Sequence, residues 1–146
     1  MRKITNPWRQ LPDFRCFGCS PDNPYGLRME IYEGDNGEVV CRWHPESQFQ
    51  GWPGVLHGGI QCTLMDEIAA WVVSHDLNCD AVTSKLNTKF IKPVLTSDPF
   101  LTIKAKLTKH AHKLAWIETW IENAAGERCA EAEAIYFITK NRNESL

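Results

Sequence analysis

Residues 55–75, VLHGGIQCTLMDEIAAWVVSH, hold the groups of this chain that are best placed to do chemistry. The stretch opens with His57-Gly58-Gly59 and continues as an apolar run without proline or further glycine. The two glycines let the backbone turn sharply and be approached closely. The first N–H groups of a helix have no intrahelical partner and lie at the positive end of its dipole. A helix starting here is predicted to stabilise a developing negative oxygen, and a tight turn without a ligand is the alternative.

Asp66 occupies an unusual position on this predicted helix. On a helical wheel of residues 60–75 the polar residues Thr63, Glu67 and Ser74 form a narrow arc, and apolar residues cover most of the rest. Such a helix is typically buried. Asp66 falls among the apolar residues, where a carboxylate is costly unless it is paired or used chemically. We interpret it as a candidate catalytic group, with a structural hydrogen bond from a neighbouring strand as the alternative. Glu67 is expected to be solvated or paired.

Length and composition limit the kind of protein this chain can be. We expect one domain over residues 1–146, with an N-terminal arm at 1–26 and a frayed tail at 141–146. A formal charge of -2 argues against a nucleic-acid binder. The N-terminus is polar and broken by prolines, unlike a signal peptide, and no apolar run reaches the length of a membrane span. We therefore expect a cytoplasmic protein with no nucleic-acid or membrane partner.

Six cysteines are present, and Cys16 and Cys19 form a C-x-x-C pair. A structural zinc site usually has a second ligand pair, and the sequence contains none at a recognisable spacing. The other cysteines in apolar-patterned segments are typical of small buried hydrophobic residues. We therefore expect that Cys16 and Cys19 are free thiols that hold no metal and form no disulfide.

Strands are predicted on both sides of the helix. Alternating apolar residues predict one strand over residues 27–32 and another over 39–43, joined by the turn Gly34-Asp35-Asn36-Gly37. Four further strands follow the helix, over residues 82–91, 101–108, 116–122 and 129–138. A helix that is apolar nearly all round requires a sheet that curves around it.

This layout and several motifs resemble the hotdog-fold acyl-CoA thioesterases, in the branch of the phenylacetic-acid-pathway thioesterase and the human thioesterase-superfamily proteins. The resemblance is carried by His57-Gly58-Gly59, followed nine positions after the histidine by Asp66 within Thr63-Leu64-Met65-Asp66-Glu67. Residues 83–93, with an asparagine and a closing proline, resemble the family's strand after the helix. Cys16-Phe17-Gly18-Cys19 and Asn23-Pro24-Tyr25-Gly26-Leu27 resemble an N-terminal signature of many bacterial members. The implied fold is α+β, a curved antiparallel sheet wrapped around one long central helix.

The resemblance also implies roles for single residues in acyl-CoA hydrolysis, without any cofactor. Asp66 would be the general base or nucleophile, and the Gly58 amide would bind the oxyanion. Gln50 matches the family's polar amide in the preceding loop. Thr83, on the strand after the helix, matches a position at which the family has a hydroxyl side chain, often that of serine. The remaining candidates are His57 and Glu67 at the catalytic centre, and Gly59 and Asn87 as substrate contacts.

Two expectations concern partners. Because no Walker-type phosphate loop exists, we expect Lys104, Lys106 and Lys113 to hold the CoA phosphates, with a solvated strand face as the alternative. Gly58 and Asp66 stand eight residues, or ~12 Å, apart along a helix, which is too far to act on one carbonyl. We therefore expect a homodimer with shared active sites, as the resemblance also implies. In the family such dimers often pair further into tetramers, so a dimer and a dimer of dimers both remain open.

Two other functions remain open for this sequence. A hotdog hydratase or dehydratase acts on related thioesters, but we find no second acid–base residue placed to partner Asp66. A non-catalytic acyl-CoA binding module would keep the fold without turnover.

Overall fold

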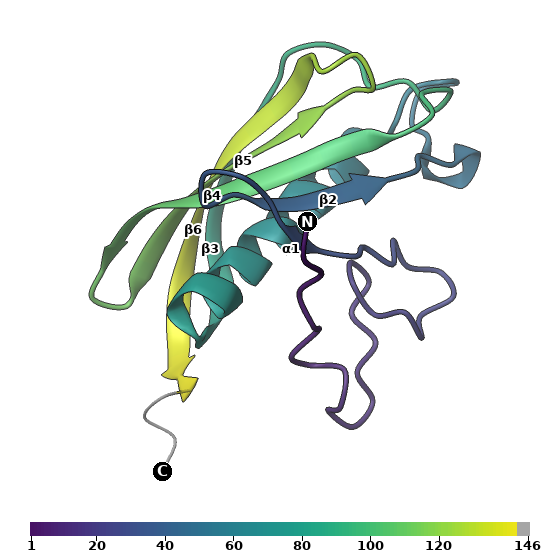
Figure 1. The fold of residues 1–146 in the computed structure, drawn as a ribbon. Coiled ribbons are helices and arrows are strands. Elements are labelled where there is room, and N and C mark those ends of the chain that lie inside the picture. The colour runs from purple at the N-terminus through teal and green to yellow at the C-terminus, as the bar shows by residue number, and fades with distance from the viewer. Residues whose placement is uncertain (143–146) are drawn as a thin grey trace.

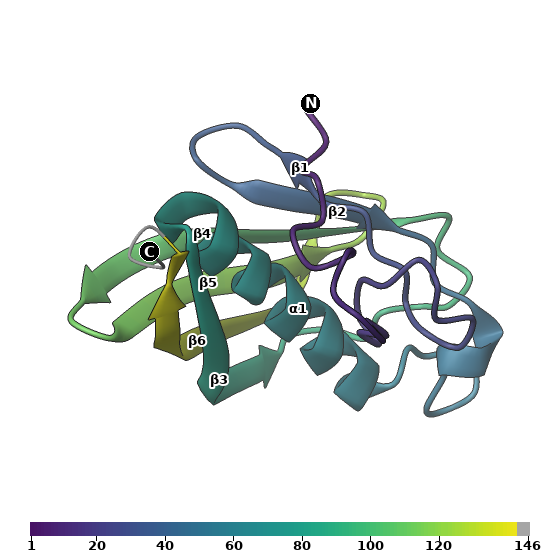
Figure 2. The same ribbon diagram turned by 90° about the horizontal axis from the view of Figure 1, so that it is seen from below.

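One long helix, α1 (Gly58–Leu77), lies across a six-stranded antiparallel sheet in the computed structural model, which describes residues 1–142. Figure 1 shows the sheet curving over the helix, and Figure 2 shows the helix from its open side. The strands are β1 (Tyr32–Glu33), β2 (Val39–Trp43), β3 (Cys79–Phe90), β4 (Leu101–Ala111), β5 (Leu114–Glu122) and β6 (Arg128–Asn141). A short 3-10 turn, η1 (Ser47–Phe49), precedes the helix. This arrangement confirms the predicted fold class.

The order of strands in the sheet is β1-β2-β4-β5-β6-β3. Hairpins join β1 to β2, β4 to β5 and β5 to β6, and their tight turns contain residues with positive φ: Asn36, Gly37, His112 and Gly126. Because α1 connects β2 to β3, the chain crosses from one side of the sheet to the other. As a result β3 becomes an edge strand that pairs only with β6.

The core lies between α1 and the concave face of the sheet. The helix buries Leu64, Met65, Ile68 and Val72 completely. Opposite it, β6 carries the buried alanines Ala130, Ala132 and Ala134, whose small side chains let the helix lie close to the strand. At the helix C-terminus, Asn78 adopts a left-handed conformation and its N–H donates to the Ser74 carbonyl. Within residues 1–142, no helix combines the length and the apolar character that a membrane span requires.

The N-terminal segment differs from the prediction. We expected residues 27–32 to be a sheet strand, but only Tyr32–Glu33 joins the sheet. The buried Leu27 and Met29 instead donate backbone hydrogen bonds of 2.7 and 2.9 Å to Phe17 and Gly18. Apolar and charged residues alternate over residues 27–31 because every second side chain is buried under the N-terminal loop. In both ribbon views this loop runs beside α1.

The C-terminal end also differs from the prediction, which placed fraying from residue 141. Strand β6 continues to Asn141, and the Arg142 guanidinium donates to the backbone oxygen of Ser74 at 2.8 Å and to its hydroxyl at 2.6 Å. This bond ties the end of β6 to the last turn of α1. The rest of the expected tail, residues 143–146, lies outside the described residues.

Tyr136 links β6 to the middle of α1. Its side chain is 2% exposed, and its hydroxyl lies 2.6 Å from the Asp66 backbone oxygen and 2.5 Å from the carboxylate oxygen Oδ1. Burial, followed by the negative charge of Asp66, raises the pKa of the Tyr136 phenol far above its usual value. The hydroxyl therefore keeps its proton and remains a donor at neutral pH and at pH values where an ordinary tyrosine begins to ionise.

We expect Tyr136→Phe to lower the free energy of unfolding by about 1.5–3 kcal/mol, the range for a hydrogen bond to a charged group. The raised pKa adds a dependence on pH. Unfolded tyrosine ionises near pH 10.0, whereas folded Tyr136 stays neutral, so this contribution is complete below pH 10.0 and is lost as the pH rises further. Urea unfolding of both proteins at pH 7 and at higher pH measures the two effects.

The matched control is Tyr25→Phe, because the Tyr25 side chain is 83% exposed. This change should leave stability at pH 7 unaltered. An identical alkaline loss of stability in the wild type and in Tyr136→Phe would contradict the assigned role of Tyr136.

Candidate active site

The helix start is organised by His57. Its Nδ1 accepts a 2.8 Å hydrogen bond from the Gly59 N–H, and its backbone oxygen accepts the Gln61 N–H at 3.0 Å. The ring therefore caps the first turn and occupies the Gly59 amide. The Gly58 N–H, by contrast, makes no hydrogen bond with any described residue. Gly58 can therefore offer its amide to a ligand.

Gln50 lies beside the helix start, at the end of the η1 turn. Its side-chain oxygen Oε1 accepts the Gly54 N–H at 3.1 Å, and its backbone pairs with Leu56. A shallow cavity of about 290 Å³ opens here, lined by Gln48, Phe49, Gln50, His57, Gly59 and Ile60. The structure therefore brings together the predicted residues Gln50, His57 and Gly59 at one end of α1.

The Asp66 carboxylate lies two turns further along the helix and is partly buried. Its Oδ1 accepts hydrogen bonds from the Thr83 hydroxyl at 2.8 Å and from the Tyr136 hydroxyl at 2.5 Å. Its second oxygen, Oδ2, accepts none from the described residues. One oxygen is therefore held by two neutral donors and fixes the carboxylate, while the other remains available to take a proton from a bound molecule.

A β-bulge in β3 sets the position of Thr83. The pairing of β3 with β6 shifts between Thr83 and Lys85, so that the strict alternation predicted for this strand is interrupted. Beyond the bulge, Thr88 accepts a hydrogen bond from the Cys62 thiol at 3.5 Å, and the Phe90 ring packs against Gly58. Thr83, Thr88 and Phe90 therefore all face α1, although an unbroken strand would turn Thr83 to the opposite side.

Glu67 does not join the Asp66 site, contrary to its place among the catalytic candidates. Its Oε1 accepts a 3.1 Å hydrogen bond from the Cys16 thiol, and its Oε2 accepts one of 3.0 Å from the Trp71 indole. Adjacent helix residues point about 100° apart, so Glu67 faces the N-terminal loop while Asp66 faces β3 and β6.

Three of the predicted substrate contacts lie on the sheet face opposite α1. Asn87 is exposed beside Glu131 and Glu133 in a surface hollow. Lys104 forms ion pairs with Glu122 at 3.3 Å and Glu38 at 4.0 Å, and Lys106 pairs with Glu118 at 3.9 Å. The single chain thus does not bring these three side chains to Asp66.

Lys113 lies elsewhere, in the β4–β5 hairpin. With His110, His112 and Lys140 it lines a hollow of about 460 Å³. It forms no ion pair with a carboxylate within residues 1–142. Its backbone oxygen accepts the N–H of Ile138, two residues beyond Tyr136. The hollow is therefore lined by basic side chains. It lies at the same end of β6 as Tyr136, the residue that contacts Asp66.

Tyr136 is the residue of the site that the sequence analysis missed. It lies within the strand predicted over residues 129–138 and was not among the candidate site residues. A signal was nevertheless present, because a buried tyrosine normally needs a partner for its hydroxyl, and Asp66 was the polar group expected within the core.

Comparison with known proteins places this geometry in a family. A model of the thioesterase superfamily matches residues 53–130, which include α1 and the strands β3, β4 and β5 that follow it. A hypothetical thioesterase from Streptococcus pneumoniae, solved with coenzyme A, is 28% identical with a TM-score of 0.70 and covers 78% of this chain and 88% of that one. The same protein has been solved with an aspartate and with a threonine replaced by alanine.

Two relatives are similar in sequence. An uncharacterised protein of Schizosaccharomyces pombe is 29% identical over 73% of this chain. The match spans 62% of the length of that protein. A protein of Saccharolobus solfataricus, named provisionally as an esterase, is 27% identical over 80% of this chain and 82% of its own length. Since the family model covers more than half of the sequence and the fold is shared, the chain belongs to the thioesterase superfamily.

Proposed function

We propose that this protein is an acyl-CoA thioesterase that hydrolyses an acyl- or aryl-CoA to the free acid and CoA. The observation that carries the proposal is the Asp66 carboxylate, fixed through Oδ1 by Thr83 and Tyr136 and open at Oδ2. The coenzyme A held by the Streptococcus pneumoniae relative supports a CoA thioester as the substrate. The aspartate and threonine replaced in that protein are the residue types of the Asp66–Thr83 pair.

In the proposed reaction Asp66 acts as a general base. Its Oδ2 takes a proton from a water molecule whose oxygen attacks the thioester carbonyl carbon. The negative charge that develops on the carbonyl oxygen is stabilised by the free Gly58 N–H at a helix N-terminus. Cleavage of the carbon–sulfur bond then releases the CoA thiolate, which receives the proton from Asp66. Direct attack by Asp66, with an acyl anhydride intermediate, is the alternative route.

One chain cannot perform this reaction alone, because its Gly58 amide and Asp66 stand ~12 Å apart along α1. The edge strand β3 suggests how a second chain completes the site. If two β3 strands pair antiparallel about a two-fold axis at Asn87, the bulged residue Ser84 brings Thr83 of one chain opposite Phe90 of the other. Thr83 contacts Asp66 and Phe90 packs against Gly58, so this pairing brings the two halves of a site together.

The exposed surface of β3 supports this dimer. The strand is twelve residues long and unpaired on its outer edge, and Val82 and Phe90 are 56% and 52% exposed. Long edge strands with exposed apolar side chains are usually covered in natural proteins. We therefore propose a homodimer with two shared sites, and further pairing into tetramers is compatible with it.

A hydratase or dehydratase is less well supported. Such an enzyme needs a second acid–base group near Asp66, but His57 caps the helix and Glu67 faces the N-terminal loop. A non-catalytic binding module is distinguished by experiment. A panel of acyl-CoAs with a thiol-detecting reagent reports released CoA for a thioesterase, and product analysis reports an altered acyl chain for a hydratase.

We expect Asp66→Asn to lower thioesterase turnover at least ~100-fold, because the amide cannot take a proton from water. The fold should be retained, since the amide oxygen can still accept hydrogen bonds from Thr83 and Tyr136. Asp76→Asn, an exposed change on the same helix, is the matched control and should have near-normal activity. Turnover of Asp66→Asn close to that of the control would remove Asp66 from the mechanism.

Mixing two inactive variants tests the shared site. Gly58→Leu should abolish activity, because a side chain at this position contacts the Phe90 ring. It would also occupy the space that the oxyanion needs beside the Gly58 amide. After subunit exchange with Asp66→Asn, half of the dimers are mixed, and each of these contains one intact site. Activity should therefore rise to about a quarter of the wild-type value. If mass spectrometry demonstrates exchange and activity stays at background, the shared site is disproved.

The structure favours Lys113 over Lys104 as a contact for the CoA phosphates, because Glu38 and Glu122 already neutralise Lys104. We expect Lys113→Glu to raise KM several-fold with little change in kcat, and the effect to shrink as ionic strength rises. Lys104→Glu should raise KM less. A larger effect at Lys104 would place the phosphates on the outer face of the sheet instead.

A further inference from the structure

Three groups that commonly bind metals meet on the side of α1 that faces away from β3. The Sγ atoms of Cys16 and Cys19 and a carboxylate oxygen of Glu67 all lie within 4.8 Å of one another. The expectation that the two cysteines hold no metal depended on the absence of a second ligand pair in the sequence. The fold supplies a third ligand, Glu67, from a position 48 residues after Cys19.

The N-terminal loop is shaped to hold the two thiols over the helix. A turn is closed by the Ser20 N–H, which donates to the Cys16 oxygen at 3.0 Å. Gly18 lies between the cysteines, and a Cβ atom at this position would collide with the Glu67 carboxylate. Only glycine therefore allows the loop to lie directly on Glu67.

Neighbouring residues orient these potential ligands. The Trp71 indole donates to Oε2 of Glu67 at 3.0 Å, which leaves Oε1 on the side of the thiols. The Asn6 amide lies 3.6 Å from the Cys19 sulfur as a donor. Hydrogen bonds of this kind, to the carboxylate and to the sulfur of the ligands, are usual around protein metal sites. The edge of Trp8 packs on Trp71 with ring centroids 5.5 Å apart and fixes that indole in turn.

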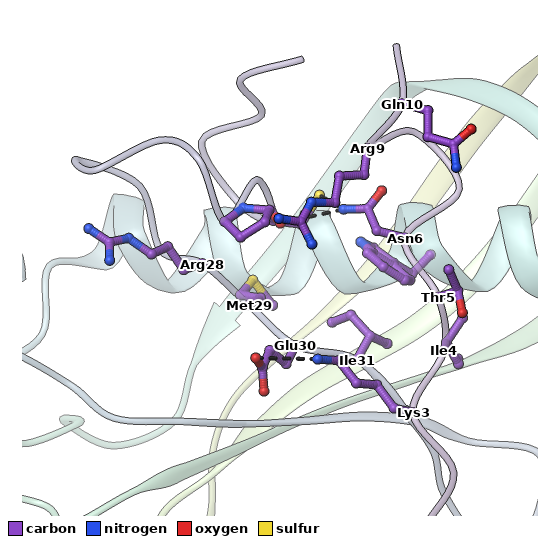
Figure 3. Close-up of a pocket in the computed structure, with 13 residues that line it drawn as sticks. Lys3, Ile4, Thr5, Asn6, Arg9, Gln10, Arg28, Met29, Glu30 and Ile31 are labelled. Atoms are coloured by element: carbon purple, nitrogen blue, oxygen red, sulfur yellow. Dashed lines mark hydrogen bonds and ion pairs between the residues drawn. The ribbon is translucent and has the colours of Figure 1, made fainter.

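The cluster is reachable from solvent. A cavity of about 660 Å³ lies between the N-terminal arm and α1, and Cys19 and Trp71 form part of its wall. Figure 3 shows this cavity with Asn6, Arg9, Met29 and Ile31 around it. Cys19 is 3% exposed, whereas Cys16 and Glu67 are only partly buried. A small cation can therefore approach ligands that are otherwise protected by the loop.

We propose that Cys16, Cys19 and Glu67 form a binding site for a zinc-like divalent cation, with water as the fourth ligand. Thiolate sulfur and carboxylate oxygen are established zinc ligands, at about 2.3 Å and 2.0–2.2 Å from the metal. A tetrahedron with these bond lengths has ligand–ligand edges of about 3.5–3.8 Å, so the 3.1 Å contact between Cys16 and Glu67 must widen slightly and the other separations, at most 4.8 Å, must shorten to this range. Binding releases the two thiol protons, and the site with its metal carries one negative charge.

The proposed metal would have a structural role that is independent of thioester hydrolysis. It would join the N-terminal loop to α1 at Glu67, the residue next to Asp66. The loop is otherwise held to this part of the helix by the hydrogen bond from Cys16 to Glu67 and by the packing of Trp8 on Trp71. A bound ion would thus stabilise the folded arm through mass action.

Titration with Co²⁺ tests this site in the full-length chain. The protein is first stripped of metal and kept reduced, and all six cysteines are confirmed as free thiols by counting. We expect one Co²⁺ per chain, with a thiolate-to-cobalt charge-transfer band that one equivalent of Zn²⁺ abolishes. Cys16→Ser, Cys19→Ser and Glu67→Gln should each weaken binding at least ~10-fold.

The matched control is Cys62→Ser, which removes a thiol from the other side of α1 and should leave Co²⁺ binding unchanged. Circular dichroism establishes that each variant is folded. The proposal is overturned if the wild type shows no charge-transfer band, or if the band survives unchanged in folded Cys16→Ser and Cys19→Ser. It is also overturned if Cys62→Ser weakens binding as much as the loop variants do, because the ion would then lie elsewhere.

Discussion

The burial of a carboxylate within an apolar helix is the constraint on which the rest of this structure depends. Asp66 lies on α1 among side chains that form the core, where an unpaired charge would destabilise the fold. Two hydroxyl donors from different strands, Thr83 on β3 and Tyr136 on β6, satisfy one of its oxygens. The arrangement also leaves a reactive oxygen in a partly buried position, which is what the proposed chemistry requires.

Two successive carboxylates on α1 are used for different purposes. Asp66 faces the strands and the proposed dimer axis, whereas Glu67 faces a loop that begins fifty residues earlier in the chain. The body of the helix separates the two, and each has its own hydrogen-bond donors. A pair of adjacent acidic residues thus provides the carboxylate of the proposed hydrolysis on one side of the helix and a contact to the N-terminal arm on the other.

Most of the architecture could be predicted from the sequence, because the helix and the later strands have clear periodicities. The helical periodicity of residues 60–75 also placed Asp66 among apolar side chains. Residues 27–31 were misassigned because burial under a loop produces the same alternation as a sheet. The contact between Thr83 and Asp66 could not be derived from alternation, since the bulge before Lys85 reverses the faces of the strand. Contacts such as Cys16 with Glu67 join segments that are distant in sequence, and no local pattern encodes them.

The position of β3 at the sheet edge has a consequence for how the protein is made. Within residues 1–142, β3 pairs in the sheet only with β6, which is the last of the six strands in chain order. Until β6 is synthesised, α1 lacks Tyr136, and β3 has neither edge paired. The side of α1 that carries Asp66 must therefore wait for β6 before its contacts are complete, and long-range pairings of this kind form slowly. The proposed site is thus completed late during synthesis, and nascent chains that stop before β6 would leave β3 open to aggregation.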